Sequence, residues 1–165
     1  MQLRKPFRVL SCLVLAVLLA GAAAFAGAAP GELSLSASLF NPNDGGTTWS
    51  ARSEYLIPLA GGPLYAGPSG EIFDGPGFDG GAVGVAGEFH IGKTCGPGFG
   101  GAAHKLFGDA SDQAAWTYEV RALFECGNQH AALKITGRQV WSRAEDGAVT
   151  EPDGKRFDAG VVWRV

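Results

Sequence analysis

The chain lacks any cluster of basic residues. Its 165 residues include 13 Lys and Arg against 16 Asp and Glu, which gives a formal net charge of −3. Three of the basic residues, Arg4, Lys5 and Arg8, precede an apolar run, and without them the formal charge falls to −6. Proteins that bind nucleic acid concentrate positive charge on one surface. The composition therefore argues against a nucleic-acid partner.

The sequence also lacks the usual patterns that hold cofactors. The glycine-rich segment 96–100 opens no predicted helix and has no Lys-Ser/Thr after it, so it is not a phosphate loop. The acidic segment 145–154 misses the spacing of a calcium-binding EF-hand. The cysteines have no third and fourth ligand near them in sequence. We therefore expect no cofactor and no metal.

The N-terminal segment has the composition of a secretory signal peptide. A basic start is followed by the apolar run 9–20 and then by small residues through Ala29. A membrane anchor is the alternative, but the apolar run is short for one. We predict a signal peptide at 1–29 and a single domain at 30–165. Cys12 would leave with the signal, and Cys95 and Cys126 would meet in a compartment that permits a disulfide.

Most of the remaining chain alternates between apolar and polar residues. The segment 116–126 is the clearest case: Trp116, Tyr118 and Val120 lie on one face, and Glu119 and Arg121 on the other. Strict alternation is typical of a β-strand whose two faces meet different surroundings. We predict eight strands, of which the third and fifth alternate least clearly: 33–39, 49–59, 64–73, 82–91, 99–107, 116–126, 131–141 and 156–165.

Eight such strands predict an all-β fold, an eight-stranded antiparallel up-and-down β-barrel. Strands of about 9–11 residues are long enough to cross a bilayer at a tilt. A soluble lipocalin-like barrel or a sandwich would alternate equally well, so the pattern alone leaves the direction of the faces open.

The predicted connections differ between the two ends of the barrel. Short turns, one of them at 94–98, alternate with generally longer loops, of which 143–155 is the longest. The acids of the connections fall in the longer loops: Asp44, Asp74, Asp79, Asp109, Asp112, Glu145, Asp146, Glu151 and Asp153. Outer-membrane barrels show this asymmetry, with short turns at one rim and long loops at the other.

Two sets of residues follow from a transmembrane arrangement. A narrow lumen would hold a polar network, for which we predict Arg52, Glu54, Glu71, Glu88, His90, Glu119, Arg121, Glu125, Lys134, Arg138, Asp158 and Arg164. Aromatic side chains collect at membrane interfaces. We predict this role for the aromatic residues that share the apolar face of their strands: Trp49, Trp116, Trp141, Phe157 and Trp163.

The last predicted strand carries the most specific likeness. Apolar residues alternate back from the C-terminus at Val165, Trp163, Val161, Ala159 and Phe157. With this strand, the chain resembles the small eight-stranded outer-membrane β-barrels of Gram-negative bacteria, although those usually end in Phe or Trp. The resemblance implies an outer-membrane location, with lipid and the barrel-insertion machinery as partners.

Three functions are compatible with this pattern. The favoured one is a non-enzymatic outer-membrane barrel with a structural or surface-interaction role, whose acidic loops could meet an external partner. The second is a secreted or periplasmic soluble barrel that binds a small apolar ligand. The third is a lipid A-modifying barrel enzyme; in similar deacylases the catalytic His and Ser lie two residues apart, and none of His90, His104 and His130 has such a Ser.

The direction of the faces can be tested by substitution. Val120→Arg should block membrane insertion if Val120 faces lipid, because an arginine in contact with the hydrocarbon costs about 2–4 kcal/mol at the midplane. Leu123→Arg, on the opposite face, should be tolerated better. Insertion of both variants into membranes is the measurement, and equal effects would show that the faces are assigned wrongly.

Overall fold

The computed structural model describes residues 31–40, 47–75, 80–92, 94–108, 115–143 and 149–164; for 149–153 it describes the backbone alone. The predicted signal peptide at 1–29 lies outside these residues. So do Asp44, Asp79, Asp109, Asp112, Glu145 and Asp146 of the predicted acidic loops. Among the described residues, no helix has the length and apolarity needed to cross a membrane.

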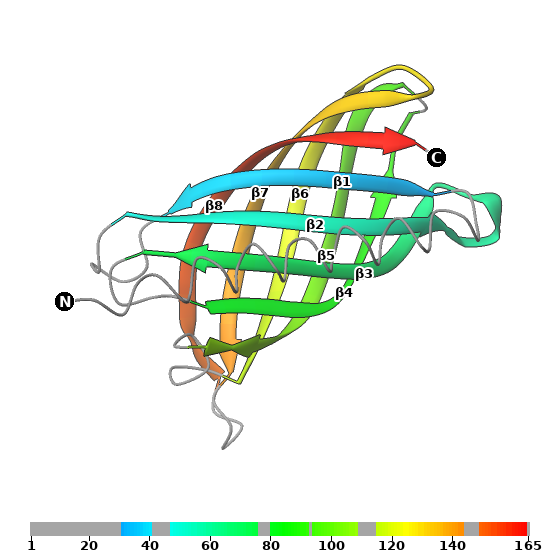
Figure 1. Ribbon diagram of the computed structural model, residues 1–165. Helices are drawn as coiled ribbons and strands as arrows, with labels where there is room; N and C mark the ends of the chain where they lie inside the picture. Colours follow the sequence, from blue (N-terminus) through cyan, green and yellow to red (C-terminus); the bar gives the residue numbers. More distant parts are fainter. Residues whose placement is uncertain are drawn as a thin grey trace.

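The described chain forms a closed antiparallel β-barrel, as the sequence predicted (Figure 1). The strands are β1 (Glu32–Phe40), β2 (Thr48–Pro58), β3 (Leu64–Asp74), β4 (Gly80–His90), β5 (Cys95–Phe107), β6 (Trp116–Gly127), β7 (Ala131–Arg143) and β8 (Val149–Arg164). Each strand pairs with its neighbour in sequence, and β1 pairs with β8 to close the sheet. Closure leaves no strand edge unpaired.

The closing pair depends on a glycine. Gly160 of β8 lies opposite Ser36 of β1. A Cβ atom at Gly160 would lie 2.2 Å from the carbonyl oxygen of Leu35 and 2.6 Å from the Cβ of Ser36. A larger residue would therefore force β1 and β8 apart at the seam.

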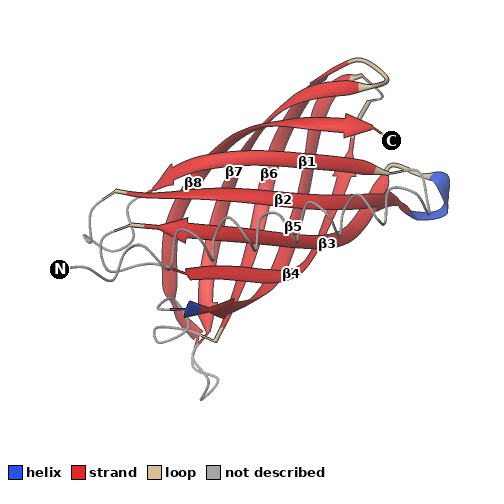
Figure 2. Cartoon of the chain, viewed as in Figure 1, coloured by secondary structure: helices blue, strands red, loops and turns tan. Residues whose placement is uncertain are grey.

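The connections divide between the two ends of the barrel (Figure 2). We call the end with connections 59–63, 91–94 and 128–130 the short-turn rim; the first of these includes a 3-10 turn at Leu59–Gly61. The long-loop rim carries connections 41–47, 75–79, 108–115 and 144–148. The alternation of the two classes follows the prediction, but the difference in length is smaller than expected.

Two segments predicted as connections belong largely to strands, so these predictions were wrong. The predicted turn 94–98 largely forms the start of β5, because Cys95 to Gly98 pair with β6. The predicted loop 143–155 is shorter, because β8 begins at Val149. Pro152 lies opposite Trp141, where the register of β7 and β8 shifts. Proline has no backbone N–H to donate to the neighbouring strand, and an irregularity in the strand pairing accommodates it. The alternation of apolar and polar residues in the sequence is interrupted at the same place.

The disulfide between Cys95 and Cys126 is confirmed, but its setting differs from the expectation. The predicted turn 94–98 placed Cys95 outside the strands. Instead Cys95 opens β5 and lies directly opposite Cys126 in the adjacent β6. The bond therefore fastens one strand pair at the short-turn rim.

Removal of the disulfide should destabilise the barrel. The bridged residues are 31 apart in sequence, and loop-closure entropy for that length corresponds to about 3–4 kcal/mol. We expect the Cys95→Ser/Cys126→Ser variant to lose up to that amount, measured as the free energy of unfolding in urea. Dithiothreitol should lower the stability of the wild type and leave the variant unchanged. An equal response of both proteins would contradict the prediction.

Candidate functional site

The interior of the barrel is charged. Along β6, Thr117, Glu119, Arg121, Leu123 and Glu125 are buried and alternate with more exposed residues. The structure brings the whole predicted lumenal set to the inward side: its members are buried, apart from His90 and Arg164, which are half-buried at the short-turn rim. Successive side chains of a strand point to opposite faces of the sheet. If one charged residue of a strand points inward, every second residue from it points inward as well.

Arg52 occupies the middle of this interior. Its guanidinium is 2.8 Å from Glu54 and 2.8 Å from Glu119, and the second contact crosses the barrel from β2 to β6. Arg121 reaches the same Glu54 carboxylate at 2.7 Å. Each of these side chains is 3–6 % exposed. The middle of the lumen is therefore filled by ion pairs.

Arg138 organises the side towards the long-loop rim. Its guanidinium lies 2.8 Å from Glu71, 2.6 Å from Asp158 and 3.0 Å from Glu119. It makes two hydrogen bonds each to Glu71 and Asp158. Arg138 thereby connects β7 to β3, β6 and β8.

An apolar layer lies beyond these charges. Phe40, Phe73, Ala82 and Leu106 form a buried cluster near the ends of their strands. The guanidinium of Arg156 lies 3.8 Å above the ring of Phe40 and 3.6 Å from Glu71, so it joins the apolar layer to the ion pairs. The interior is thus packed towards the long-loop rim.

Glu88 organises the side towards the short-turn rim. Lys134 donates to both of its oxygens at 2.6 and 2.7 Å, and Arg121 lies 3.2 Å from it. His90 Nε2 lies 2.9 Å from Glu88 Oε2. The network therefore continues from the middle of the lumen to the imidazole at the rim.

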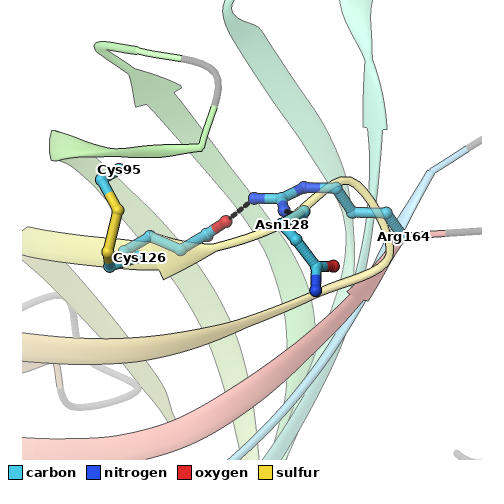
Figure 3. The surroundings of a disulfide bond; sticks show 5 residues. Cys95, Cys126, Asn128 and Arg164 are labelled. Carbon is cyan, nitrogen blue, oxygen red and sulfur yellow. Dashed lines mark hydrogen bonds and ion pairs between the residues drawn. A yellow bond between two sulfur atoms is a disulfide. The ribbon is translucent and has the colours of Figure 1, made fainter.

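Two carboxylates and an arginine complete this end. Arg164 binds Glu32 through Nε at 2.9 Å and Glu125 through Nη2, and it also donates to the carbonyl oxygen of Asn128. Figure 3 shows Arg164 reaching across to the turn that holds Asn128, beside the disulfide at Cys126. The ring of Tyr65 stacks on His90 with a centroid distance of 4.7 Å.

A pocket opens among these residues, with a volume of about 710 Å³. Glu32, Tyr65, His90, Glu125 and Arg164 all contribute to its lining. Residues of the network therefore line a cavity at this rim.

The predicted lumenal set omits further members of this interior, among them Glu32, Ser69, His104 and Arg156. All are buried. Alternation along the strands could have identified two of them, since Ser69 lies on the same face as Glu71, and Arg156 on the same face as Asp158. His104 was missed because the fifth segment alternates poorly in sequence. Glu32 lies one residue before the predicted first strand.

Ser69 and His104 form a pair that no short motif could reveal. The Ser69 hydroxyl lies 3.0 Å from His104 Nε2, although the residues are 35 apart in sequence. A serine beside a histidine is an element of nucleophilic catalysis. Ser69 and His104 are only 3 % and 2 % exposed, and Ser69 also donates to Glu54. The pair therefore belongs to the internal network, where a substrate has no access.

The predicted aromatics lie on the outer side of the barrel. Trp49, Trp116 and Phe157 are 40 %, 42 % and 70 % exposed, and Trp141 is half-buried. Trp49, Trp116 and Trp141 lie near the long-loop ends of their strands. Phe157 lies opposite Gly137 in the middle of β7, and Trp163 pairs with Ala131 at the short-turn rim. Their interfacial role stays a prediction.

The fold and interior together define a closed eight-stranded antiparallel β-barrel with a charged lumen. No protein-family model matches the chain, and no curated protein matches it. Among solved structures, it is similar to the solution NMR structure of the de novo designed TMB2.3, with a TM-score of 0.48 and 12 % sequence identity. The match covers 84 % of this chain and 97 % of the designed one.

Arg138→Met should be strongly destabilising. Loss of the guanidinium leaves Glu71 and Asp158 without their main cation, and breaking a buried pair in this way costs about 3–5 kcal/mol. The measurement is the free energy of unfolding. Addition of Glu71→Gln to Arg138→Met should recover part of the loss, because an amide needs no counter-charge.

Lys155→Met is the matched control, since Lys155 is exposed on the outer side. It should change the stability little. If Arg138→Met were no more destabilising than Lys155→Met, the ion pairs would not be what supports the interior.

Proposed function

We propose that this protein is an integral outer-membrane β-barrel without enzymatic activity, which acts as a structural or surface-interaction protein. Its lumen would be closed by the ion-paired network, so that it forms no wide channel. Lipid and the barrel-insertion machinery would be its partners, with β8 as the amphipathic strand that such machinery reads.

One observation carries this proposal: the outer face of the barrel is apolar while the inner face is charged. Large apolar side chains with more than half of their surface exposed include Leu39, Val85, Phe99, Val120, Phe124, Leu133, Ile135 and Phe157. They come from β1 and β4 to β8. Soluble monomers rarely expose apolar surface so extensively, and a large patch marks contact with protein or membrane.

The outer aromatics support the same placement. Tyr118 and Trp141 lie directly opposite each other on neighbouring strands, and Trp116 opens β6 nearby. Trp163 lies towards the other rim. Rings near both ends of an apolar band correspond to the two interfaces of a bilayer.

The arrangement of the faces disfavours a soluble carrier for an apolar ligand. Such a carrier would have Tyr118 and Val120 inside, and Glu119 and Arg121 outside. The observed order is the reverse, with Tyr118 and Val120 40 % and 56 % exposed and both charged residues buried. An apolar ligand would meet ion pairs in the lumen.

Fractionation of cells tests the proposal directly. The folded protein should sediment with the outer membrane and resist extraction by high salt and alkaline carbonate, because its apolar outer face is in contact with lipid. Detergent should release it as a folded barrel. A known periplasmic protein serves as the control for leakage. Recovery of the folded protein from a detergent-free periplasmic extract would contradict the membrane assignment.

A further inference from the structure

The rim gathers three metal-ligating side chains from three strands that are not neighbours. Glu32 comes from β1, His90 from β4 and Glu125 from β6. One donor atom of each lies within 4.8 Å of the donor atoms of the other two. We propose that Glu32, His90 and Glu125 bind a divalent transition-metal ion of the Zn²⁺ type at the mouth of the barrel.

The hydrogen bond to Glu88 prepares His90 for this role. The carboxylate accepts from Nε2 at 2.9 Å, so Nε2 carries a proton, and in the neutral imidazole the other ring nitrogen then presents its lone pair. That nitrogen, Nδ1, faces Glu32 Oε2 at 3.8 Å, which is too long for a hydrogen bond. A metal-bound histidine characteristically donates its other N–H to a carboxylate in this manner.

Arg164 holds the two carboxylates in place. It contacts the Oε1 atom of Glu32 and the Oε1 atom of Glu125. The second oxygen of Glu32, Oε2, is the atom that lies 3.8 Å from His90 Nδ1. Glu125 is only 5 % exposed, and its Oε2 atom is buried without a hydrogen-bond partner among the described residues. A buried carboxylate oxygen with no donor is unfavourable, and a cation would satisfy it.

The space and the donors both fit such an ion. The three ligands line the 710 Å³ pocket, which gives the ion a path from the solvent and room for a water as fourth ligand. Bond lengths to Zn²⁺ of about 2.0–2.2 Å place neighbouring donors roughly 3.3 Å apart. Small side-chain rotations would bring His90 Nδ1 and Glu32 Oε2, now 3.8 Å apart, to that separation. An imidazole with two carboxylates favours zinc-like ions over Mg²⁺ or Ca²⁺.

The inference goes beyond the proposed function and does not depend on it. A metal at this point would tie β1, β4 and β6 together across the open end, whether the barrel spans a membrane or not. No metal was expected from the sequence, because neither the cysteines nor the acidic segment 145–154 offers a complete set of ligands close together in the chain. Residues 32, 90 and 125 are brought together only by closure of the barrel.

Zn²⁺ titration of the oxidised mature protein, from which Cys12 has been removed with the predicted signal peptide, tests the site. The folded barrel is titrated in detergent micelles against a chromophoric chelator, and the absence of free thiols is verified first. We expect one Zn²⁺ per barrel. His90→Gln and Glu125→Gln should each weaken binding by about 10–100-fold or more, since loss of even an outer partner has an effect of that size.

His130→Gln is the matched control, because His130 lies exposed in the turn at the same rim and outside the cluster. It should leave the Zn²⁺ affinity unchanged. Absence of stoichiometric binding to the wild type would overturn the proposal, as would binding that survives both ligand variants or is lost in His130→Gln. Because either ligand variant could misfold, Co²⁺ is also added to the wild type. Intense visible bands of a four-coordinate ion are expected, and weak six-coordinate bands would overturn the assignment.

Discussion

The structure depends on the pairing of charges inside a closed sheet. A buried charge is tolerated only where opposite charges and hydrogen bonds surround it. Arg138 meets this requirement by contacting Glu71, Asp158 and Glu119, which belong to three other strands. Arg52 and Arg121 repeat the arrangement in the next layer around Glu54. The same contacts that neutralise the lumen therefore also hold opposite walls of the barrel together.

This interior determines what the exterior must be. Successive side chains of a strand alternate, so a face devoted to charge leaves the apolar residues outside. The barrel is thus inverted relative to a soluble carrier: Arg121 is 5 % exposed and its neighbour Val120 is 56 % exposed. The apolar surface calls for an apolar surrounding, and it forms the basis of the proposed location in a membrane.

The two ends of the lumen differ in a way that bears on function. Towards the long-loop rim the interior is packed with Phe40, Phe73 and Leu106. Towards the short-turn rim the network reaches a pocket at His90 and Arg164. There the disulfide of Cys126 fastens β6 next to Glu125, which restricts the position of a rim carboxylate. A ligand of the barrel would therefore be polar or ionic and would enter at this rim.

The pairing of the cysteines could be predicted because only two of them follow the predicted signal. Alternation is a local property, and it predicted the strands and which residues of a strand share a face. The sequence located Arg52, Glu119 and Arg138 on one face for the same reason. It failed where local pattern is interrupted, as at Pro97 and Pro152, which lie within β5 and β8. Which charged side chains form ion pairs, and which residues come together at the short-turn rim, depends on closure of the barrel. Contacts such as Ser69 with His104, or Glu32 with His90, join residues far apart in sequence, so no local pattern encodes them.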